Sequence, residues 1–184
     1  MNTPFRVGTK VYLRPFAREE APQLARWIND PEVTRTLLMY RPMSVQAEEA
    51  WVASLGTGMD DIVLGIALKD GDALIGSVGL HRIDWKNRHA SFGILIGEKG
   101  EWGKGYGTEA TALMTAYAFD TLNLNRVWLH VYENNARGLR AYEKVGFRRE
   151  GVLRQETFRQ GRYFDAYIMA ILRQDWEQRS PIGA

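Results

Sequence analysis

Residues 94–110 read Ile94-Leu95-Ile96-Gly97-Glu98-Lys99-Gly100-Glu101-Trp102-Gly103-Lys104-Gly105-Tyr106-Gly107-Thr108-Glu109-Ala110, and they say more about the fold than any other part of the chain. A short apolar run ends in a glycine-dense loop, which continues into a segment whose apolar residues have helical spacing. Glycine lets a backbone turn sharply and approach a ligand closely. The first N–H groups of a helix lack intrahelical partners and favour a bound anion. The segment therefore predicts a strand, a phosphate-binding loop and a helix.

Two common phosphate-binding motifs do not fit this loop. A dinucleotide fingerprint requires G-x-G-x-x-G, but Thr108 stands where the third glycine belongs. A P-loop requires G-x-x-x-x-G-K-[ST], but Glu98 occupies the first glycine position and Gly105 replaces Ser or Thr. On this segment alone, a glycine-rich loop without a ligand stays open as an alternative, because such loops are common.

A second informative segment reads Glu133-Asn134-Asn135-Ala136-Arg137-Gly138-Leu139-Arg140-Ala141-Tyr142-Glu143-Lys144-Val145-Gly146-Phe147. It follows the run Val127-Trp128-Leu129-His130-Val131, which has the composition and alternation of a strand. Gly146 fits the left-handed position that follows a helix end. The segment therefore predicts a strand followed by a helix over 136–145.

Together the two segments resemble the GNAT superfamily of N-acetyltransferases. In that superfamily a [QR]-x-x-G-x-[GA] loop holds the pyrophosphate of acetyl-CoA, and an N-x-x-[SAG]-x-x-x-Y-x-K-x-G-F run forms a second cofactor-contacting helix. The loop is matched as Trp102-x-x-Gly105-x-Gly107, with Trp where the family has Gln or Arg. The second run is matched at Asn135, Gly138, Tyr142, Lys144, Gly146 and Phe147. The chain looks closest to the branch that contains ribosomal-protein N-terminal acetyltransferases and bacterial spermidine acetyltransferases.

The remaining segments fit a single α/β domain over residues 1–184, with a core of about 10–176 that the resemblance covers. Alternating or helically spaced apolar residues predict the elements. Strands are expected near 11–13 and at 62–68, 73–83, 90–96, 126–132, 152–158 and 163–172; helices are expected at 18–29, from Ser44 to about 55, at 108–122 and at 136–145; the tail from Gln178 is expected to fray. The resemblance implies a GNAT-like fold with a central, mostly antiparallel sheet, in which the fourth and fifth strands, at 90–96 and 126–132, splay apart.

The resemblance also implies which residues bind acetyl-CoA as the co-substrate. Backbone groups of Ile94, Leu95 and Ile96 would hydrogen-bond the pantetheine arm, which behaves like an added strand, and an N–H of this strand would stabilise the oxyanion. The pyrophosphate would lie against the backbone N–H groups of Trp102, Gly103, Lys104, Gly105, Tyr106, Gly107 and Thr108. Asn135 would contact the pantetheine, and capping its own helix is an equal alternative.

Tyr142 matches the general acid of the family, whose hydroxyl protonates the CoA thiolate as it leaves. An unperturbed phenol has a pKa near 10 and can donate a proton at neutral pH. The general base stays open, because many relatives carry a glutamate in an A-E-x-G pattern where this chain reads Ala90-Ser91-Phe92-Gly93. The candidates are His81, His130, Glu133 and a chain of waters.

The acceptor amine is expected to lie across the sheet from the cofactor, between the first two helices and the last hairpin. Side chains that could line this site are Met39, Tyr40, Trp51 and Trp85. A polyamine would require converging carboxylates, for which the candidates are Glu48, Glu49, Glu133 and Glu156. A protein N-terminus would instead require an open groove, so a small-molecule amine and a protein α-amine both stay open. The alternative function is a catalytically silent acetyl-CoA sensor or scaffold, which the missing glutamate favours and Tyr142 disfavours.

Bulk composition narrows the function classes. The 24 Lys and Arg residues against 22 Asp and Glu residues give a net charge of +2, too balanced to favour nucleic-acid binding. The absence of cysteine excludes disulfides, thiolate metal sites and a cysteine nucleophile. The three histidines lack metal-ligand spacing, so no metal is expected. No apolar run is long enough to span a membrane, and residues 1–10 lack a signal-peptide core, so we expect a cytoplasmic protein without a membrane partner. The resemblance adds a homodimer as one option, because many relatives are dimers.

Overall fold

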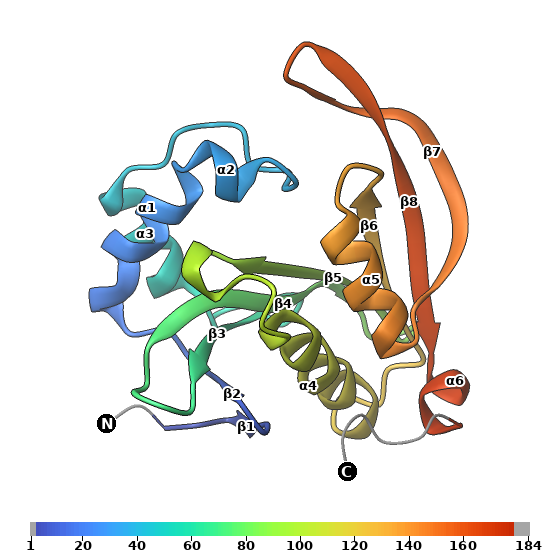
Figure 1. Ribbon diagram of the computed structural model, residues 1–184. Helices are drawn as coiled ribbons and strands as arrows, with labels where there is room; N and C mark the ends of the chain where they lie inside the picture. Colours follow the sequence, from blue (N-terminus) through green and yellow to red (C-terminus); the bar gives the residue numbers. More distant parts are fainter. Residues whose placement is uncertain (1–2, 179–184) are drawn as a thin grey trace.

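A single mixed sheet organises the molecule (Figure 1). The computed structural model describes residues 3–178, in which eight strands follow the order β1-β2-β3-β4-β5-β6-β8-β7. The strands are β1 Arg6–Val7, β2 Val11–Arg14, β3 Ile62–Leu68, β4 Leu74–Asp84, β5 His89–Ile96, β6 Arg126–Tyr132, β7 Arg148–Arg159 and β8 Arg162–Leu172. The helices are η1 Arg18–Glu20, α1 Ala21–Ile28, α2 Pro31–Thr34, α3 Val45–Ser54, η2 Lys99–Glu101, α4 Tyr106–Asp120, α5 Ala136–Val145 and α6 Arg173–Glu177. Every neighbouring strand pair is antiparallel except β5 and β6, which confirms the predicted α/β fold with a mostly antiparallel sheet.

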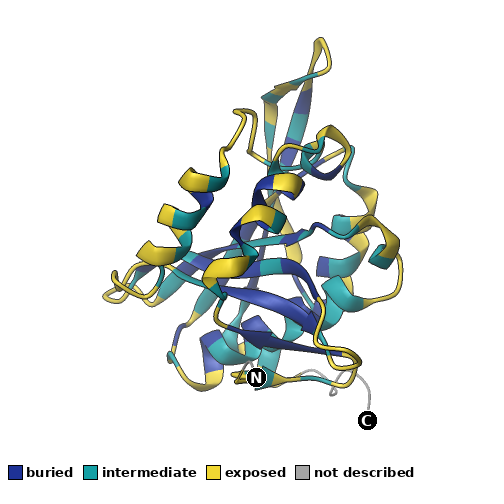
Figure 2. Ribbon diagram, turned by 90° about the vertical axis from the view of Figure 1, so that its left-hand side faces the viewer, coloured by how far each residue is buried: buried dark blue, intermediate teal, exposed yellow. Residues whose placement is uncertain are grey.

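Different helices cover the two faces of the sheet (Figure 1). On one face, called here the α4 face, Met114 of α4 and Leu139 of α5 join a buried cluster with Phe92 of β5. On the other, called the α1 face, Trp27 of α1 packs in a second cluster with Leu95 of β5. Burying a large apolar side chain fully contributes roughly 1.5–3 kcal/mol. Figure 2 shows buried segments in the sheet and along one side of the helices, and the two clusters place a different packed layer on each face of β5.

Strands β5 and β6 run parallel and pair only at their beginnings. His89–Ser91 is hydrogen-bonded to Arg126–Trp128, and the ladder then ends. Residues 92–96 of β5 therefore keep an edge that no strand of the described sheet covers. This arrangement confirms the predicted splay between the two strands, and it leaves room between them for an extended ligand.

Two helix predictions near the N-terminus differ from the structure. The segment expected to form one helix from residue 18 is divided into the 3₁₀ turn η1 and the helix α1, with a proline at the start of α1. The short helix α2 was not predicted, because Asp30-Pro31 was interpreted only as a stop. In the structure Asp30 caps α2, accepting a hydrogen bond from the N–H of Glu32 at 2.8 Å, and Pro31 is its first residue. Proline is well tolerated there, since the first helical N–H needs no partner.

Helix α4 begins two residues earlier than the predicted start at Thr108. Gly105 has φ +89° and serves as the N-cap, so the helix follows it directly. Ser44 caps α3 as predicted, through a hydrogen bond from the N–H of Ala47 at 3.1 Å. The glycine loop and the helix start are therefore one continuous feature.

The C-terminal hairpin is longer than predicted and extends away from the rest of the molecule (Figure 1). β7 starts at Arg148 instead of 152 because two bulges let the strand continue through polar residues. The turn at Gln160-Gly161 is confirmed, with Gly161 at φ +81°. β1 and α6 were not predicted, and most of the tail expected to fray lies outside the described residues.

None of the helices within residues 3–178 combines the length and apolar character that a membrane crossing requires.

Candidate active site

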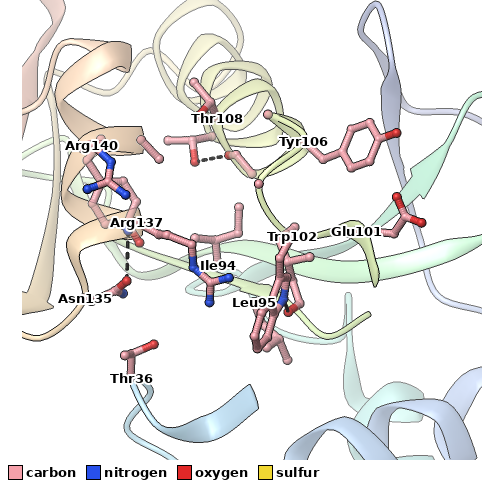
Figure 3. A pocket seen from close by; sticks show the side chains of 18 of the residues that line it. Thr36, Ile94, Leu95, Glu101, Trp102, Tyr106, Thr108, Asn135, Arg137 and Arg140 are labelled. Carbon is pink, nitrogen blue, oxygen red and sulfur yellow. Dashed lines mark hydrogen bonds between the residues drawn. The ribbon is translucent and has the colours of Figure 1, made fainter. Parts of the chain in front are cut away.

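A cavity of about 290 Å³ opens where β5 and β6 separate. Its lining comes from β5, the glycine loop, the start of α4, one side of α5 and the segment after α2 (Figure 3). Most of the predicted cofactor-binding residues line this cavity, and Tyr142 lines it as well. Those that line the cavity are Ile94, Leu95, Ile96, Trp102, Gly103, Gly105, Tyr106, Gly107, Thr108, Asn135 and Tyr142. Lys104 is the exception among the predicted residues, since it is not part of this lining.

The glycine loop presents backbone N–H groups to the cavity. Gly103 and Gly105 have φ values of +80° and +89°, which residues other than glycine rarely adopt. Gly105 offers no side-chain cap, so the first N–H groups of α4, at Tyr106, Gly107 and Thr108, lack partners within the helix. They carry the positive end of the helix dipole. This arrangement is suited to a bound phosphate group.

Trp102 has a structural role that explains its place in the motif. Its indole Nε1 donates a hydrogen bond to the carbonyl of Ile96 at 2.7 Å, which ties the loop to the end of β5. The guanidinium of Arg137 lies 4.0 Å from the centre of the Trp102 ring. Figure 3 shows the two side chains together at the cavity. Trp102 therefore holds an arginine from a neighbouring helix where the family motif has its own long polar side chain.

Sequence reasoning missed the cations of α5 as site residues. Arg137, Arg140 and Lys144 all line the cavity. Their spacing of three and four residues places them on one side of the helix, and this spacing is the signal that could have found them. Lys104, which sequence reasoning did name, instead pairs with Glu101 at 2.9 Å, and this hydrogen bond raises the pKa of the lysine.

The direction of the β5 backbone separates the three residues expected to contact pantetheine. The N–H of Gly97 donates to the carbonyl of Ile75 in β4 at 2.9 Å. Because backbone groups alternate in direction along a strand, those of Leu95 also face β4, whereas those of Ile94 and Ile96 face the open edge. Leu95 lines the cavity with its side chain instead, which packs on the α1 face.

Asn135 caps helix α5. Its side-chain oxygen accepts a hydrogen bond from the N–H of Gly138 at 2.9 Å. A Cβ atom added to Gly138 would lie 2.7 Å from Asn135 Nδ2, so the glycine makes room for the capping side chain. The capping alternative is therefore present in the structure, and Asn135 also belongs to the cavity lining.

Tyr142 is buried on the α4 face, with an exposed fraction of 8%. Its ring meets that of Phe92 edge to face, with centres 6.1 Å apart. Burial raises the pKa of the Tyr142 phenol. The hydroxyl therefore stays protonated throughout the neutral range, and it has no hydrogen-bond partner among residues 3–178.

The aromatic residues proposed for the acceptor site do not meet. The backbone carbonyls of Leu37 and Met39 accept hydrogen bonds from Arg159 of β7 at 2.8 and 3.3 Å, and Tyr40 lies beside the same guanidinium. These contacts join the segment after α2 to the hairpin. Trp51 instead packs against Phe16, with ring centres 5.7 Å apart. Trp85 lies in a separate shallow hollow with Asp60, Asp61 and Arg82.

The four candidate carboxylates do not converge either. Glu49 pairs with Arg18 at 3.7 Å on the surface, Glu133 accepts from the N–H of Asp165 at 3.3 Å, and Glu156 is exposed. Glu48 differs, since only 5% of it is exposed.

Glu48 carries a buried carboxylate that no cation of the described chain neutralises. It lies on α3 one turn before Val52, and Val52 packs on the α1-face cluster that contains Leu95. Burial raises the pKa of the Glu48 carboxyl. A carboxylate in this position is costly unless a ligand pairs with it.

A metal centre finds no support in the described part of the chain, where no three potential ligand side chains cluster.

Comparisons with known proteins agree with the architecture. A family model for the acetyltransferase (GNAT) domain matches residues 10–148. The "Uncharacterized N-acetyltransferase p20" of Bacillus licheniformis is 29% identical over 174 residues, which covers 91% of this chain and 95% of that protein. The spermidine N(1)-acetyltransferase of Vibrio cholerae is 38% identical over 107 residues, which covers 58% of this chain and 61% of that protein.

A solved structure with the same fold is the spermidine N-acetyltransferase from Vibrio cholerae in complex with CoA and spermine. It has a TM-score of 0.84 and 27% identity, and the match covers 93% of this chain and 100% of that one. The family model spans most of this chain, which therefore belongs to the GNAT acetyltransferases. The protein is an acetyl-CoA-dependent N-acetyltransferase.

Proposed function

We propose that this enzyme transfers the acetyl group of acetyl-CoA to a primary amine of a small polyamine, by direct attack within a ternary complex. The observation that carries the proposal is Glu48, a carboxylate 5% exposed on the α1 face with no cationic partner among residues 3–178. A relative whose name specifies spermidine, and a structural neighbour solved with spermine, support the same acceptor class.

The cofactor phosphates are assigned to the part of the cavity that the glycine loop lines. Backbone N–H groups of the loop and of the first turn of α4, at residues 103–108, would hold the pyrophosphate. Arg137 lies at the same place, fixed by its stack on Trp102 at 4.0 Å. Arg140 and Lys144 would add charge at the mouth. The N–H of Trp102 is left out because it already donates to the carbonyl of Lys99 at 3.2 Å, and Lys104 contributes its backbone only.

The pantetheine arm would continue along the open edge of β5. The backbone N–H and C=O groups of Ile94 and Ile96 face this edge. The carbonyl of Ile96 already accepts a hydrogen bond from the Trp102 indole. The arm would therefore bond the N–H of Ile96 and both groups of Ile94, in the manner of an added strand. Because the pyrophosphate lies beyond Ile96, the thioester at the other end of the arm would lie near Phe92 and Gly93, where a β5 N–H stabilises the oxyanion.

Tyr142 would protonate the departing thiolate. It reaches this end of the arm from the α4 face, beside Phe92 at 6.1 Å between ring centres. A phenol kept protonated by burial is a proton donor across the neutral range. The nitrogen of the amine attacks the thioester carbon, the C–S bond breaks, and Tyr142 gives its proton to sulfur.

The amine would approach from the α1 face. The packed cluster around Met114 and Tyr142 fills the α4 face, whereas on the α1 face β5 carries Gly93, which has no side chain, next to the packed Leu95. A distal ammonium of a polyamine would pair with Glu48, since the buried carboxylate offers an unscreened negative charge. One ammonium is thereby held while another amine reaches the thioester.

An acceptor panel tests this function. The chain has no cysteine, so a disulfide dye reports CoA release without background from the protein. The panel contains spermidine, spermine, an aminoglycoside, free amino acids and short peptides with varied N-termini, and mass spectrometry identifies the product. Release with spermidine, giving mono-acetylspermidine, is expected. Release with peptides alone would replace the polyamine by a protein N-terminus, and acetyl-CoA binding without release for any amine would favour the sensor alternative.

A further inference from the structure

His81 lies on the α1 face above two glycines that face each other across the β4–β5 ladder. Gly79 and Gly93 are direct partners. A Cβ atom added to Gly79 would lie 2.9 Å from His81 Nε2, and one added to Gly93 would lie 3.4 Å from the same atom. The imidazole edge therefore occupies space that a side chain at residue 79 would need, and it lies in van der Waals range of residue 93.

This position is next to the open edge of β5. Pairing between β5 and β6 ends at Ser91, so Gly93 lies within the uncovered part of the strand. Its neighbour Phe92 contacts Tyr142 on the opposite face. The inference drawn below rests on the proposed function, which places the thioester at these two residues of β5.

The chain orients the imidazole so that Nε2 is its free nitrogen. His81 Nδ1 lies 3.5 Å from Asp61 Oδ1, and Asp61 is itself held by a hydrogen bond from the N–H of Arg82 at 2.9 Å. With Nδ1–H directed to the carboxylate, the neutral ring carries its lone pair on Nε2. Nε2 has no partner within the described chain.

Ser91 stands where many relatives have the A-E-x-G glutamate, and it supports the histidine instead of replacing that carboxylate. Its hydroxyl donates to the backbone carbonyl of His81 at 3.0 Å. A serine hydroxyl is not a base at neutral pH. On the α1 face, the titratable side chain that the described structure sets against this stretch of β5 is therefore His81.

The other base candidates lack one or more of these features. His130 is exposed, and its ring rests on Trp128 with centres 5.3 Å apart, without a carboxylate partner among the described contacts. His89 pairs with Asp84 at 3.7 Å at the closed end of the strands. Glu133 accepts a backbone hydrogen bond in the loop before α5.

We propose that His81 is the general base of the acetyl transfer and that Asp61 positions it. His81 Nε2 takes one proton from the bound ammonium, leaving a neutral amine that attacks the thioester carbon. When the C–S bond breaks, sulfur takes the Tyr142 proton, and the phenolate recovers a proton from the acylated nitrogen through water. His81 then releases its proton to solvent, so one amide, one thiol and one free proton result.

Burial favours the neutral form of this imidazole near pH 7.5. Burial is the largest influence and lowers the pKa of His81 below its ordinary value of 6.5, whereas the Asp61 carboxylate opposes it and Arg82 reinforces it. The residues of β5 in register with this part of β4, Ser91 and Gly93, carry no charge. A neutral proton acceptor is thus available near pH 7.5, where amines are still largely protonated.

The test is the pH dependence of kcat/KM for the acceptor between pH 5.5 and 9.5, in the wild type, H81Q, D61N and H130Q. The wild type should be level between about pH 7 and 9, because it deprotonates the ammonium itself. H81Q should be lower by roughly 10²-fold at pH 7.5. Its rate should rise about tenfold per pH unit, since only amine that is already free can react below a pKa near 10.

Two further variants separate catalysis from structure. D61N should shift the acid limb to lower pH, because the carboxylate that raises the pKa of His81 is gone. H130Q should stay within twofold of the wild type at every pH, and the KM for acetyl-CoA should stay within twofold in all variants. A level profile in H81Q, or an equal loss in H130Q, would overturn the assignment.

Spermidine and a short peptide are measured in parallel, so that the acceptor and the base are tested separately. If the wild type acetylates the peptide alone, the polyamine proposal fails and the H81Q comparison is made with the peptide. If it acetylates neither, hydrolysis of acetyl-CoA is compared in the same variants, and equal rates in the wild type and H81Q overturn the role of His81.

Discussion

Tyr142 and His81 lie over opposite faces of strand β5, at two adjacent residues. The Tyr142 ring contacts Phe92, with ring centres 6.1 Å apart on the α4 face. His81 Nε2 covers Gly93 from the α1 face, 3.4 Å from where its Cβ would lie. Because neighbouring residues of a strand point to opposite faces, a proton donor and a proton acceptor approach the same short piece of open backbone from its two sides. Acid and base are thereby kept apart by the strand.

The role of Tyr142 predicts a loss of turnover without a loss of binding. Y142F removes the hydroxyl and keeps the ring contacts with Phe92, so we expect kcat to fall at least about tenfold, with the acetyl-CoA Kd unchanged within twofold by calorimetry. Y117F is the matched control, because Tyr117 is on α4 and outside the cavity lining. Unchanged kcat in Y142F would remove Tyr142 from the mechanism.

The contacts of Trp102 predict two kinds of weakened cofactor binding. W102F loses the hydrogen bond to Ile96 and keeps a ring beneath Arg137, whereas R137Q keeps the ring and loses the cation. Each should raise the KM for acetyl-CoA about three- to tenfold, the equivalent of one hydrogen bond or one phosphate contact. The effect of R137Q should shrink in high salt and that of W102F should not.

A control for R137Q is R149Q, since Arg149 also stacks on an aromatic ring, at 4.5 Å from Tyr167, outside the cavity. An increase in KM for R149Q equal to that of R137Q would show that general charge, and not this position, determines affinity.

The positive φ of Gly105 predicts a cofactor defect beyond its cost in stability. G105A forces alanine into a left-handed conformation at about 1–2 kcal/mol, although its Cβ would meet nothing nearer than 3.9 Å. G71A imposes a similar strain at φ +80° in a turn with open space around it. Both should lower Tm by a few degrees, and G105A alone should raise the KM for acetyl-CoA, by about fivefold or more. Equal KM values would contradict the anion-binding role of the loop.

The buried carboxyl of Glu48 is expected to lower the stability of the fold at neutral pH and to strengthen binding of the acceptor. Burial raises the folded-state pKa of this carboxyl above its ordinary value of 4.5. Its contribution to folding therefore favours the native state below pH 4.5, is lost as pH rises through the folded pKa, and is a cost at neutral pH. We expect E48Q to have a higher Tm than the wild type at pH 7.5, and a KM for spermidine raised by about tenfold or more.

E49Q is the control for Glu48, since Glu49 is the neighbouring surface carboxylate and pairs with Arg18 at 3.7 Å. It should change neither Tm nor the spermidine KM appreciably. A spermidine KM in E48Q equal to that in the wild type would show that the buried carboxylate does not bind the acceptor.

Elements with strong local signals were predictable to the residue. The strands Ile62–Leu68 and Arg126–Tyr132 and the helix Ala136–Val145 have the predicted bounds, because apolar alternation, a capping asparagine and a terminal glycine define them locally. α2 was missed because it depends on the Asp30 side chain accepting hydrogen bonds from the first N–H groups of the helix. β1 was missed because two residues carry no periodicity, and its pairing with β2 is what makes it a strand.

The candidate site was predictable on the cofactor side and largely hidden on the acceptor side. The glycine loop and Asn135 are contiguous motifs, so their spacing alone locates them. Trp102 and Arg137 are far apart in sequence, and only the packing of α5 beside the loop brings them within 4.0 Å. The neighbourhood of His81 depends on strand register, which decides that Gly79 faces Gly93. Long-range pairing of this kind leaves no trace in local sequence patterns.

The central claim is that acetyl-CoA and the amine meet on one strand from its two faces, without an acetylated enzyme intermediate. Initial rates with acetyl-CoA and spermidine varied together test it most directly. The account predicts double-reciprocal lines that intersect, as a ternary complex requires, and mono-acetylspermidine formed in step with CoA. Parallel lines, together with an acetylated protein detected by mass spectrometry after incubation with acetyl-CoA alone, would contradict it.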